Sequence, residues 1–286
     1  PFRTTVSNNA YRDLGLGTAF ERLAWKGIVA MDHLERILWR TRPYEKTPGA
    51  ADALFQKYTR LIENRIEHKE DFNDLMRAAA KEAGELIDRD LPRKPLIGIN
   101  GEIFLRTNKF SNCDLARECE RAGLEVTISP MGEWMNYITW RNIEDGVREK
   151  QFKKVAKSYI KKFIQEKDEH SVSANVISPL DIKEPTVKEV LAFSEKYLST
   201  KCGSEALLSL GTGIEWLEND AFSGVISVMP HGCMPGGIVA AMSERFSQTY
   251  GKPWINLTYD GTRETNNLER INNFAEVIRF CAGQHI

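Results

Sequence analysis

The chain has 286 residues, of which 42% are hydrophobic and 28% are charged, and its formal net charge is −1. This predicts one large or two modest globular domains with a core of ordinary size. The balanced charge gives no argument for nucleic acid or an anionic membrane as a partner. The sequence has no run of about 18 apolar residues, so we expect no transmembrane helix. Because no secretory signal pattern stands at the start, we expect a cytoplasmic protein.

Residues 1–92 have the periodicity of helices. Apolar side chains recur at helical spacing from residue 15 to 45, until two prolines and a glycine end the pattern. Two more amphipathic stretches follow, roughly 51–68 and 70–88. We therefore predict an N-terminal helical segment.

The pattern changes to strand–helix alternation after residue 92. An apolar run at 95–100 is followed by a predicted helix that ends at Gly123, with Ser111 or Asn112 as its N-cap, and by a second strand at 124–129. Such a βαβ unit predicts a parallel sheet.

The alternation resumes after a mainly helical insertion at residues 132–205. Two further strands are predicted at 224–229 and 254–259, with helices between and after them. Right-handed crossovers with helices on both faces favour the strand order 2-1-3-4. We therefore predict an α/β fold over 93–286, in which a Rossmann-like parallel sheet of four strands follows the helical segment.

In that order the first and third strands are neighbours, and their outgoing connections diverge to opposite faces of the sheet. Open parallel sheets usually bind ligands at such a switch point. Asn100 and Glu102 could bind a ligand there or cap a helix, and His231 could polarise a ligand or make a hydrogen bond within its turn. The predicted site residues are Asn100, Gly101 and Glu102 after the first strand, His231, Gly232, Cys233 and Gly236 after the third, and Asp260 after the fourth.

Cys233 stands directly before a predicted helix, in which Pro235 suits the first position. A thiolate is stabilised near the positive end of a helix dipole, so Cys233 could be a nucleophile or a metal ligand. A small buried residue in a tight turn fits the same pattern, and a phosphate could occupy the helix N-terminus instead. The other cysteines form no CxxC pair, which argues against a disulfide framework and a self-contained zinc site. They are Cys113, Cys119, Cys202 and Cys281.

Two other segments allow more than one interpretation. The stretch 152–165 places Phe152, Ile160 and Phe163 on one side and lysines largely opposite, which predicts a solvated helix face or a partner or polyanion site. The sequence LGTG at 210–213 is typical of a nucleotide turn, but it lies within a helical stretch without a preceding strand.

Three stretches resemble the 2-hydroxyglutaryl-CoA dehydratase D-component-like superfamily, and most of all the C-terminal region of its large CoA-substrate-specific enzyme activases. They are LAWKGIVAMDHLERILWRTRPYEKTPGAADALF, IGINGEIFLRTNKFSNCDLARECERAGLEVTISPMGEWMNY and SGVISVMPHGCMPGGIVAAM. The resemblance implies cysteine-bound iron–sulfur clusters and ATP-driven, low-potential electron transfer in anaerobes. It implies Cys233 as a ligand of a 4Fe-4S cluster, and Gly101, Glu102, Arg106 and Asn108 as motif residues after the first strand.

The partners implied by the resemblance are other domains of the same protein and an acyl-CoA dehydratase-like or related reductase enzyme. The family's further cysteines and its ATP-binding domain are not in this sequence, and a 4Fe-4S cluster normally needs three or four thiolates. We therefore expect an incomplete ligand set and no catalysis by this chain alone. The alternatives are a CoA or nucleotide phosphate bound between residue 101 and residues 232–237, or a structural interaction domain with a buried Cys233. A homodimer is compatible with each.

Overall fold

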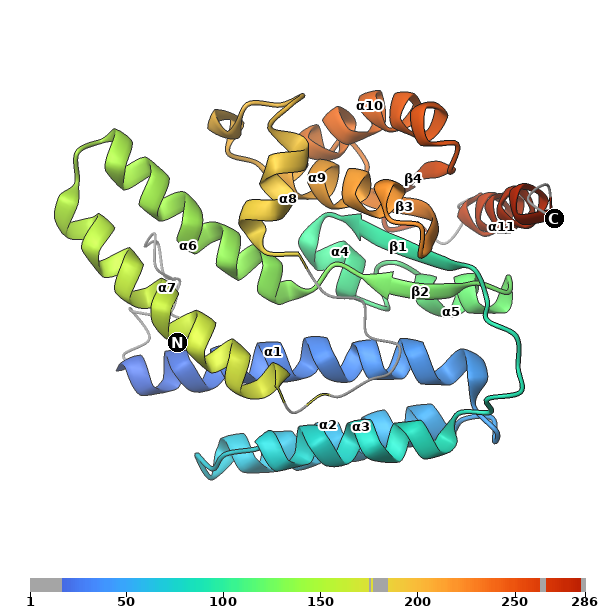
Figure 1. Cartoon of the computed structure of the whole chain (residues 1–286), viewed down its shortest axis with the longest axis horizontal. Helices are drawn as coiled ribbons and strands as arrows, with labels where there is room; N and C mark the ends of the chain where they lie inside the picture. The colour runs from blue at the N-terminus through green and yellow to red at the C-terminus, as the bar shows by residue number, and fades with distance from the viewer. Residues whose placement is uncertain (1–16, 175, 177–184, 263–265, 284–286) are drawn as a thin grey trace.

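The computed structural model describes residues 17–174, 176, 185–262 and 266–283. They form a layered α/β unit with a helical unit packed beneath it (Figure 1). Within this part of the chain, no helix combines the length and apolar character needed to cross a membrane.

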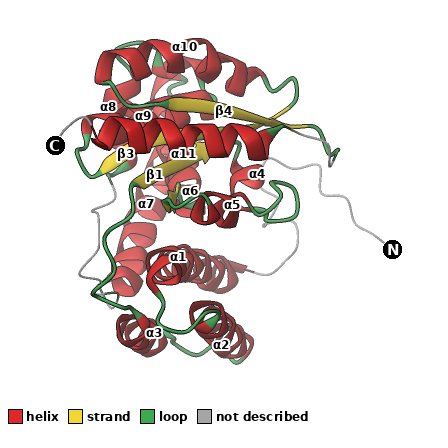
Figure 2. Ribbon diagram, turned by 90° about the vertical axis from the view of Figure 1, so that its right-hand side faces the viewer, coloured by secondary structure: helices red, strands yellow, loops and turns green. Residues whose placement is uncertain are grey.

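The helical unit consists of α1 (Gly17–Thr41), α2 (Ala50–Glu67) and α3 (Asn73–Leu86), which lie side by side below the sheet (Figure 2). A 3-10 turn at Arg42–Tyr44 holds the corner between α1 and α2, where the prolines interrupt the helical pattern. The predicted N-terminal helices are therefore present. Their shared core includes Trp25, Leu34, Tyr58, Ile62, Phe72 and Met76.

The sheet has four parallel strands in the order β2-β1-β3-β4, which confirms the predicted fold class and strand order. The strands are β1 (Leu96–Gly101), β2 (Glu125–Ile128), β3 (Phe222–Pro230) and β4 (Trp254–Tyr259). The two inner strands are buried along almost their whole length, as expected for a parallel sheet covered on both faces.

Helices cover both faces of the sheet. On one face, α9 (Glu205–Glu218) and α10 (Met234–Tyr250) pack against β1, β3 and β4. On the other face lie α5 (Leu115–Arg121), α11 (Asn267–Gly283) and Trp39 from the end of α1. Trp39 thus joins the helical unit to the apolar core on this face of the sheet.

The LGTG segment lies inside α9 and serves close packing. Leu210 and Gly213 are buried, and a Cβ on Gly213 would lie 2.1 Å from the ring of Trp254. A Cβ on Gly211 would lie 2.2 Å from the carbonyl oxygen of Val190 in α8 (Val187–Ser194). These glycines let α9 approach the sheet and α8, so the segment has no nucleotide turn.

The connection between β1 and β2 differs from the predicted single helix capped by Ser111 or Asn112. A short helix, α4 (Ile103–Thr107), starts directly after β1, and α5 begins only after Asp114. The reason is local capping, because the Glu102 carboxylate accepts hydrogen bonds from the backbone N–H groups of α4.

The insertion forms a helical hairpin of α6 (Met131–Arg148) and α7 (Phe152–Ser173), and α7 returns to pack on α1. The predicted apolar side of α7 is not its inner face. Phe152 and Phe163 are exposed, whereas Gln165 and Asp168 are buried. The inner face of this helix is therefore largely polar, and Asp168 is paired with Arg22 of α1 at 2.6 Å.

Candidate functional site

The predicted switch-point crevice exists but is small. Gly101 and Glu102, from the β1 end, line one pocket with Cys233 and Gly236, from the β3 end. Its volume is about 10 Å³, which is room for about one water molecule. The structure therefore brings together four of the predicted site residues.

Gly101 and Glu102 both have structural roles at this crevice. Gly101 has a φ of +119°, and a Cβ there would lie 2.0 Å from the carbonyl oxygen of Val228, so only glycine fits. The Glu102 carboxylate accepts hydrogen bonds from the N–H groups of Phe104 (3.2 Å) and Leu105 (2.7 Å). Of the two functions predicted for Glu102, helix capping is the one that the structure displays.

Asn100 is completely buried, and its side chain is engaged in a structural hydrogen-bond network. Its amide donates to the carbonyl oxygen of Ser209 at 2.9 Å, and its Oδ1 accepts from the Ser227 hydroxyl at 2.5 Å. The Trp254 indole in turn donates to Ser227 Oγ at 2.9 Å. The network ties β1, β3, β4 and α9 together beneath the crevice.

Arg106 and Asn108 do not line the crevice. The buried Arg106 guanidinium donates to the carbonyl oxygen of Pro130 at 2.8 Å and lies 3.5 Å from Glu133, at the start of α6. The Asn108 side chain accepts a hydrogen bond from the Ser111 N–H at 2.8 Å and closes the turn after α4.

Cys233 is the N-cap residue of α10 and its thiol is partly exposed. Its neighbours in the turn, His231 and Gly232, are exposed, and the His231 N–H pairs with the carbonyl oxygen of Tyr259 at 2.9 Å. Asp260 lies beside this turn, where hydrogen bonds from Thr262 lower the pKa of its carboxyl group.

The residues at the crevice do not fit a 4Fe-4S cluster by themselves. Cys233 is the only thiol among the described residues that line it, whereas such a cluster needs three or four thiolates. Within the described parts of the chain, no three His, Cys, Asp or Glu side chains form a group that could hold a metal ion. Cys119, a residue of α5, is buried in the core, and this burial raises the pKa of its thiol above the usual range.

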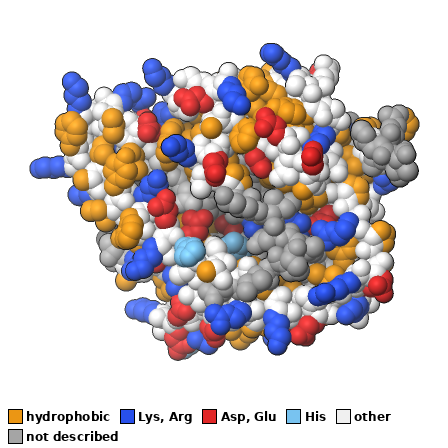
Figure 3. Space-filling view, viewed as in Figure 1, with side chains coloured by type: hydrophobic (Ala, Val, Ile, Leu, Met, Phe, Trp, Pro, Cys, Tyr) orange, Lys and Arg blue, Asp and Glu red, His pale blue; other side chains and the backbone are white. Residues whose placement is uncertain are grey.

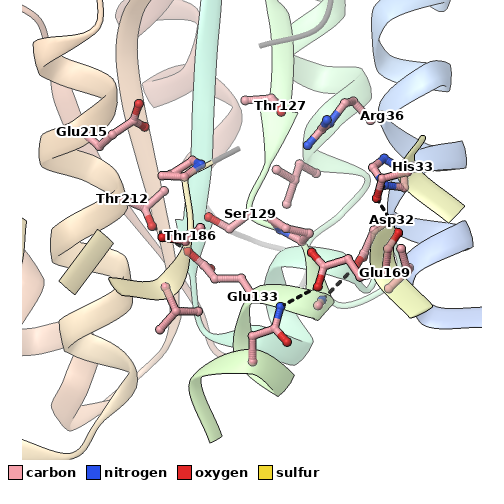
Figure 4. A pocket seen from close by; sticks show the side chains of 18 of the residues that line it. Asp32, His33, Arg36, Thr127, Ser129, Glu133, Glu169, Thr186, Thr212 and Glu215 are labelled. Carbon is pink, nitrogen blue, oxygen red and sulfur yellow. Dashed lines mark hydrogen bonds between the residues drawn. The ribbon is translucent and has the colours of Figure 1, made fainter. Parts of the chain in front are cut away.

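A much larger cavity, of about 500 Å³, lies between the helical unit and the α/β unit. We call it the interdomain cavity; it is bounded by α1, α6, α7, α9 and the carboxyl end of β2 (Figure 4). Histidine and acidic side chains show in the hollow between the two units in the space-filling view (Figure 3). Its volume lies in the range of small-molecule sites.

Asp32 of α1 forms one wall of the interdomain cavity. Its carboxylate accepts hydrogen bonds from the backbone N–H groups of Met131 (2.9 Å) and Gly132 (2.8 Å) at the first turn of α6. Burial nevertheless raises the pKa of Asp32 to about 6, against the opposing effect of these hydrogen bonds and of Arg106. The negative charge of Asp32 stabilises the positive end of the α6 dipole.

His33, the next residue, is half-buried at the same wall. Its Nε2 lies 2.8 Å from the hydroxyl oxygen of Ser173 in α7. Burial and the nearby charge of Arg36 lower the pKa of His33 to about 4, so the ring is neutral at physiological pH.

Four glutamates line the cavity: Glu133 of α6, Glu166 and Glu169 of α7, and Glu215 of α9. Glu133 of α6 accepts a hydrogen bond from the hydroxyl of Thr212 at 2.8 Å, and Glu169 of α7 accepts one from the side chain of Asn136 at 3.0 Å. Glu215 lines the cavity from α9. Burial raises the pKa values of Glu169 and Glu215.

Residue spacing did not predict this cavity, although stretches quoted in the sequence analysis contribute residues to its walls. Two of the stretches that carry the family resemblance, MDHLER at 31–36 and GEW at 132–134, place Asp32, His33 and Glu133 on its walls. Asp32 and Gly132 are 100 positions apart in the chain, so spacing could not bring them together.

Comparison of the chain with protein-family models, curated proteins and solved structures gives no match.

Proposed function

We propose that this chain is the C-terminal region of an activase-like protein of the 2-hydroxyacyl-CoA dehydratase superfamily. In that protein it docks other domains, or an acyl-CoA dehydratase-like partner, and supplies Cys233 as one thiolate ligand of an iron–sulfur cluster. The cluster serves ATP-driven, low-potential electron transfer, and its remaining thiolates come from outside this chain.

The position of Cys233 carries the proposal. It is a partly exposed thiol at the start of a helix, at the carboxyl edge of a parallel sheet, where such sheets place their sites. Two large apolar side chains near the crevice are exposed: Met234, which follows Cys233, is 71% exposed, and Phe104 in α4, which follows Glu102, is 59% exposed. Exposed apolar surface of this kind fits contact with another domain.

The test is anaerobic iron and sulfide reconstitution of the full-length protein and its Cys233→Ser variant. We expect the variant to lose most of the iron that the unmodified protein takes up. Cys202→Ser is the matched control, because this thiol is also exposed but does not line the crevice. Unchanged iron content in Cys233→Ser would show that Cys233 is not a ligand of the cluster.

The competing prediction places a CoA or nucleotide phosphate in the same crevice. Ligand pockets of that kind enclose roughly 300–1,000 Å³, whereas this crevice encloses about 10 Å³. Tight binding of CoA or ATP to the isolated chain, lost on Gly236→Val, would support that competitor against our proposal.

A further inference from the structure

The interdomain cavity displays a buried hydrogen-bonding group that no other described residue satisfies. Ser129, directly after β2, is 1% exposed, and its hydroxyl has no hydrogen-bond partner in the described part of the chain. It lies at the back of the cavity, between the α1 wall and the α9 wall (Figure 4). An orphaned buried hydroxyl costs free energy unless a ligand or water satisfies it.

Among the described residues, two carboxylates at the cavity have no cationic partner. The pKa of Glu169 is raised by burial and by the nearby charge of Glu166, and only the hydrogen bond from Asn136 opposes this. The pKa of Glu215 is raised by burial and by Glu218, and only a hydrogen bond from Asn219 opposes it. One oxygen of Glu215, Oε2, has no hydrogen-bond partner among the described residues.

Several cations also line the cavity, among them Lys188 of α8, and the described contacts of Arg40 and Lys162 direct these two elsewhere. Arg40 donates to Glu125 at 2.9 Å, and Lys162 lies 3.6 Å from Glu166. The charge of Arg36 acts on Asp32 and His33 at the α1 wall. Among the described residues, Glu169 of α7 and Glu215 of α9 are therefore the lining carboxylates on which no cation acts.

A metal ion does not meet this demand, because no suitable group of three ligands exists among the described residues. An organic cation does, because an ammonium group can pair with a single carboxylate, and a diamine can pair with one on each wall. Trp140 and Trp216 also line the cavity and offer apolar surface to the carbon chain of such a ligand.

We propose that the interdomain cavity binds a small organic amine in its ammonium form, with Glu169 and Glu215 as counter-charges and the Ser129 hydroxyl as a further hydrogen-bond partner. The ammonium group donates hydrogen bonds to buried oxygen atoms that have no partner among the described residues. This inference does not depend on the proposed cluster, because Cys233 does not line the cavity.

The test is calorimetric titration of the chain with putrescine and butylamine, against butanediol as the neutral analogue and succinate as the anionic one. We expect the amines to bind and butanediol to bind at least about tenfold more weakly, since a buried charged pair is worth more than a neutral hydrogen bond. Succinate should not bind. Tryptophan fluorescence gives a second readout, because Trp140 and Trp216 line the cavity.

The isosteric variants Glu169→Gln and Glu215→Gln should each weaken amine binding by at least about tenfold. The exposed Glu63→Gln is the matched control, and Cys233→Ser should bind amines like the unmodified chain. Circular dichroism confirms that each variant is folded. Equal binding of butanediol and putrescine, preference for succinate, or no amine binding at millimolar concentration would overturn the proposal.

Discussion

Arg40 of α1 donates a hydrogen bond of 2.9 Å to Glu125, the first residue of β2, and both side chains are excluded from solvent. Glu125 also accepts a hydrogen bond from the Tyr44 hydroxyl at 2.6 Å and lies 2.8 Å from Arg93. One buried carboxylate thus receives donors from the helical unit and from the segment that leads into the sheet. It fixes the relation between the two units, and hence the cavity between them.

Removing this carboxylate leaves buried donors without an acceptor. We expect Glu125→Ala to lower the free energy of unfolding by about 3–5 kcal/mol, as for other broken buried ion pairs. The measurement is urea unfolding followed by circular dichroism. Glu70→Gln removes an exposed pair with Arg65 (3.5 Å) and should cost less than about 1 kcal/mol. Equal effects of the two substitutions would show that the buried network does not hold the units together.

Gly101 and Gly237 make a matched pair at the switch point. A Cβ on Gly101 would lie 2.0 Å from a backbone oxygen, at a φ of +119°, whereas a Cβ on Gly237 in α10 meets nothing within 4 Å. Gly101→Ala should therefore destabilise the protein by more than about 2 kcal/mol, and Gly237→Ala should be neutral or stabilising by up to about 1 kcal/mol. Thermal unfolding of both variants tests this. If Gly101→Ala is as stable as the unmodified protein, the approach of Gly101 to Val228 does not exclude a Cβ.

The strand order was predictable because local signals agree with the global fold. Each strand is a short apolar run with a glycine or proline near its ends, and the intervening helices have clear periodicity. The convergence of Gly101 with Cys233 followed from that order alone. Asn100 and Arg106 were harder to interpret, because the same polar side chain after a strand can bind a ligand or satisfy a buried backbone group.

The interdomain cavity could not be predicted from residue spacing. Its described lining residues come from seven helices and strands, and Asp32 reaches the start of α6 only because α1 packs beneath the sheet. Likewise, the periodicity of α7 predicted an apolar face but not which way it points. In the observed orientation the inner face of α7 carries Asp168, paired with Arg22, and the core residue Val172.

Substitutions on α7 test this reversed orientation. Phe163 is 68% exposed, whereas Val172 is completely buried. Phe163→Ser should change the free energy of unfolding by less than about 0.5 kcal/mol, and Val172→Ala should lower it by about 2 kcal/mol. Denaturant unfolding of each variant gives the comparison. A larger loss for Phe163→Ser than for Val172→Ala would place the apolar stripe of α7 in the core.

His33 makes the stability of the cavity wall depend on pH. Its pKa is about 4 in the folded protein, below the ordinary value of 6.5, because burial and Arg36 disfavour the imidazolium. The unfolded state therefore binds more protons than the folded state between these two values. The stabilising contribution of neutral His33 is complete above the ordinary pKa and is lost as the pH falls toward the folded pKa.

His33→Gln removes this titration but keeps a group that can hydrogen-bond to Ser173. Between pH 7.5 and pH 5, the unmodified protein should lose up to about 2 kcal/mol of stability relative to the variant. Asp32 and Glu35, whose pKa values burial raises to about 6 and about 7, act in the opposite sense, since their contributions are lost as the pH rises. The difference between variant and unmodified protein isolates His33 from them. If the free energies of unfolding of His33→Gln and of the unmodified protein differ by the same amount from pH 7.5 to pH 5, His33 has its ordinary pKa in the folded state.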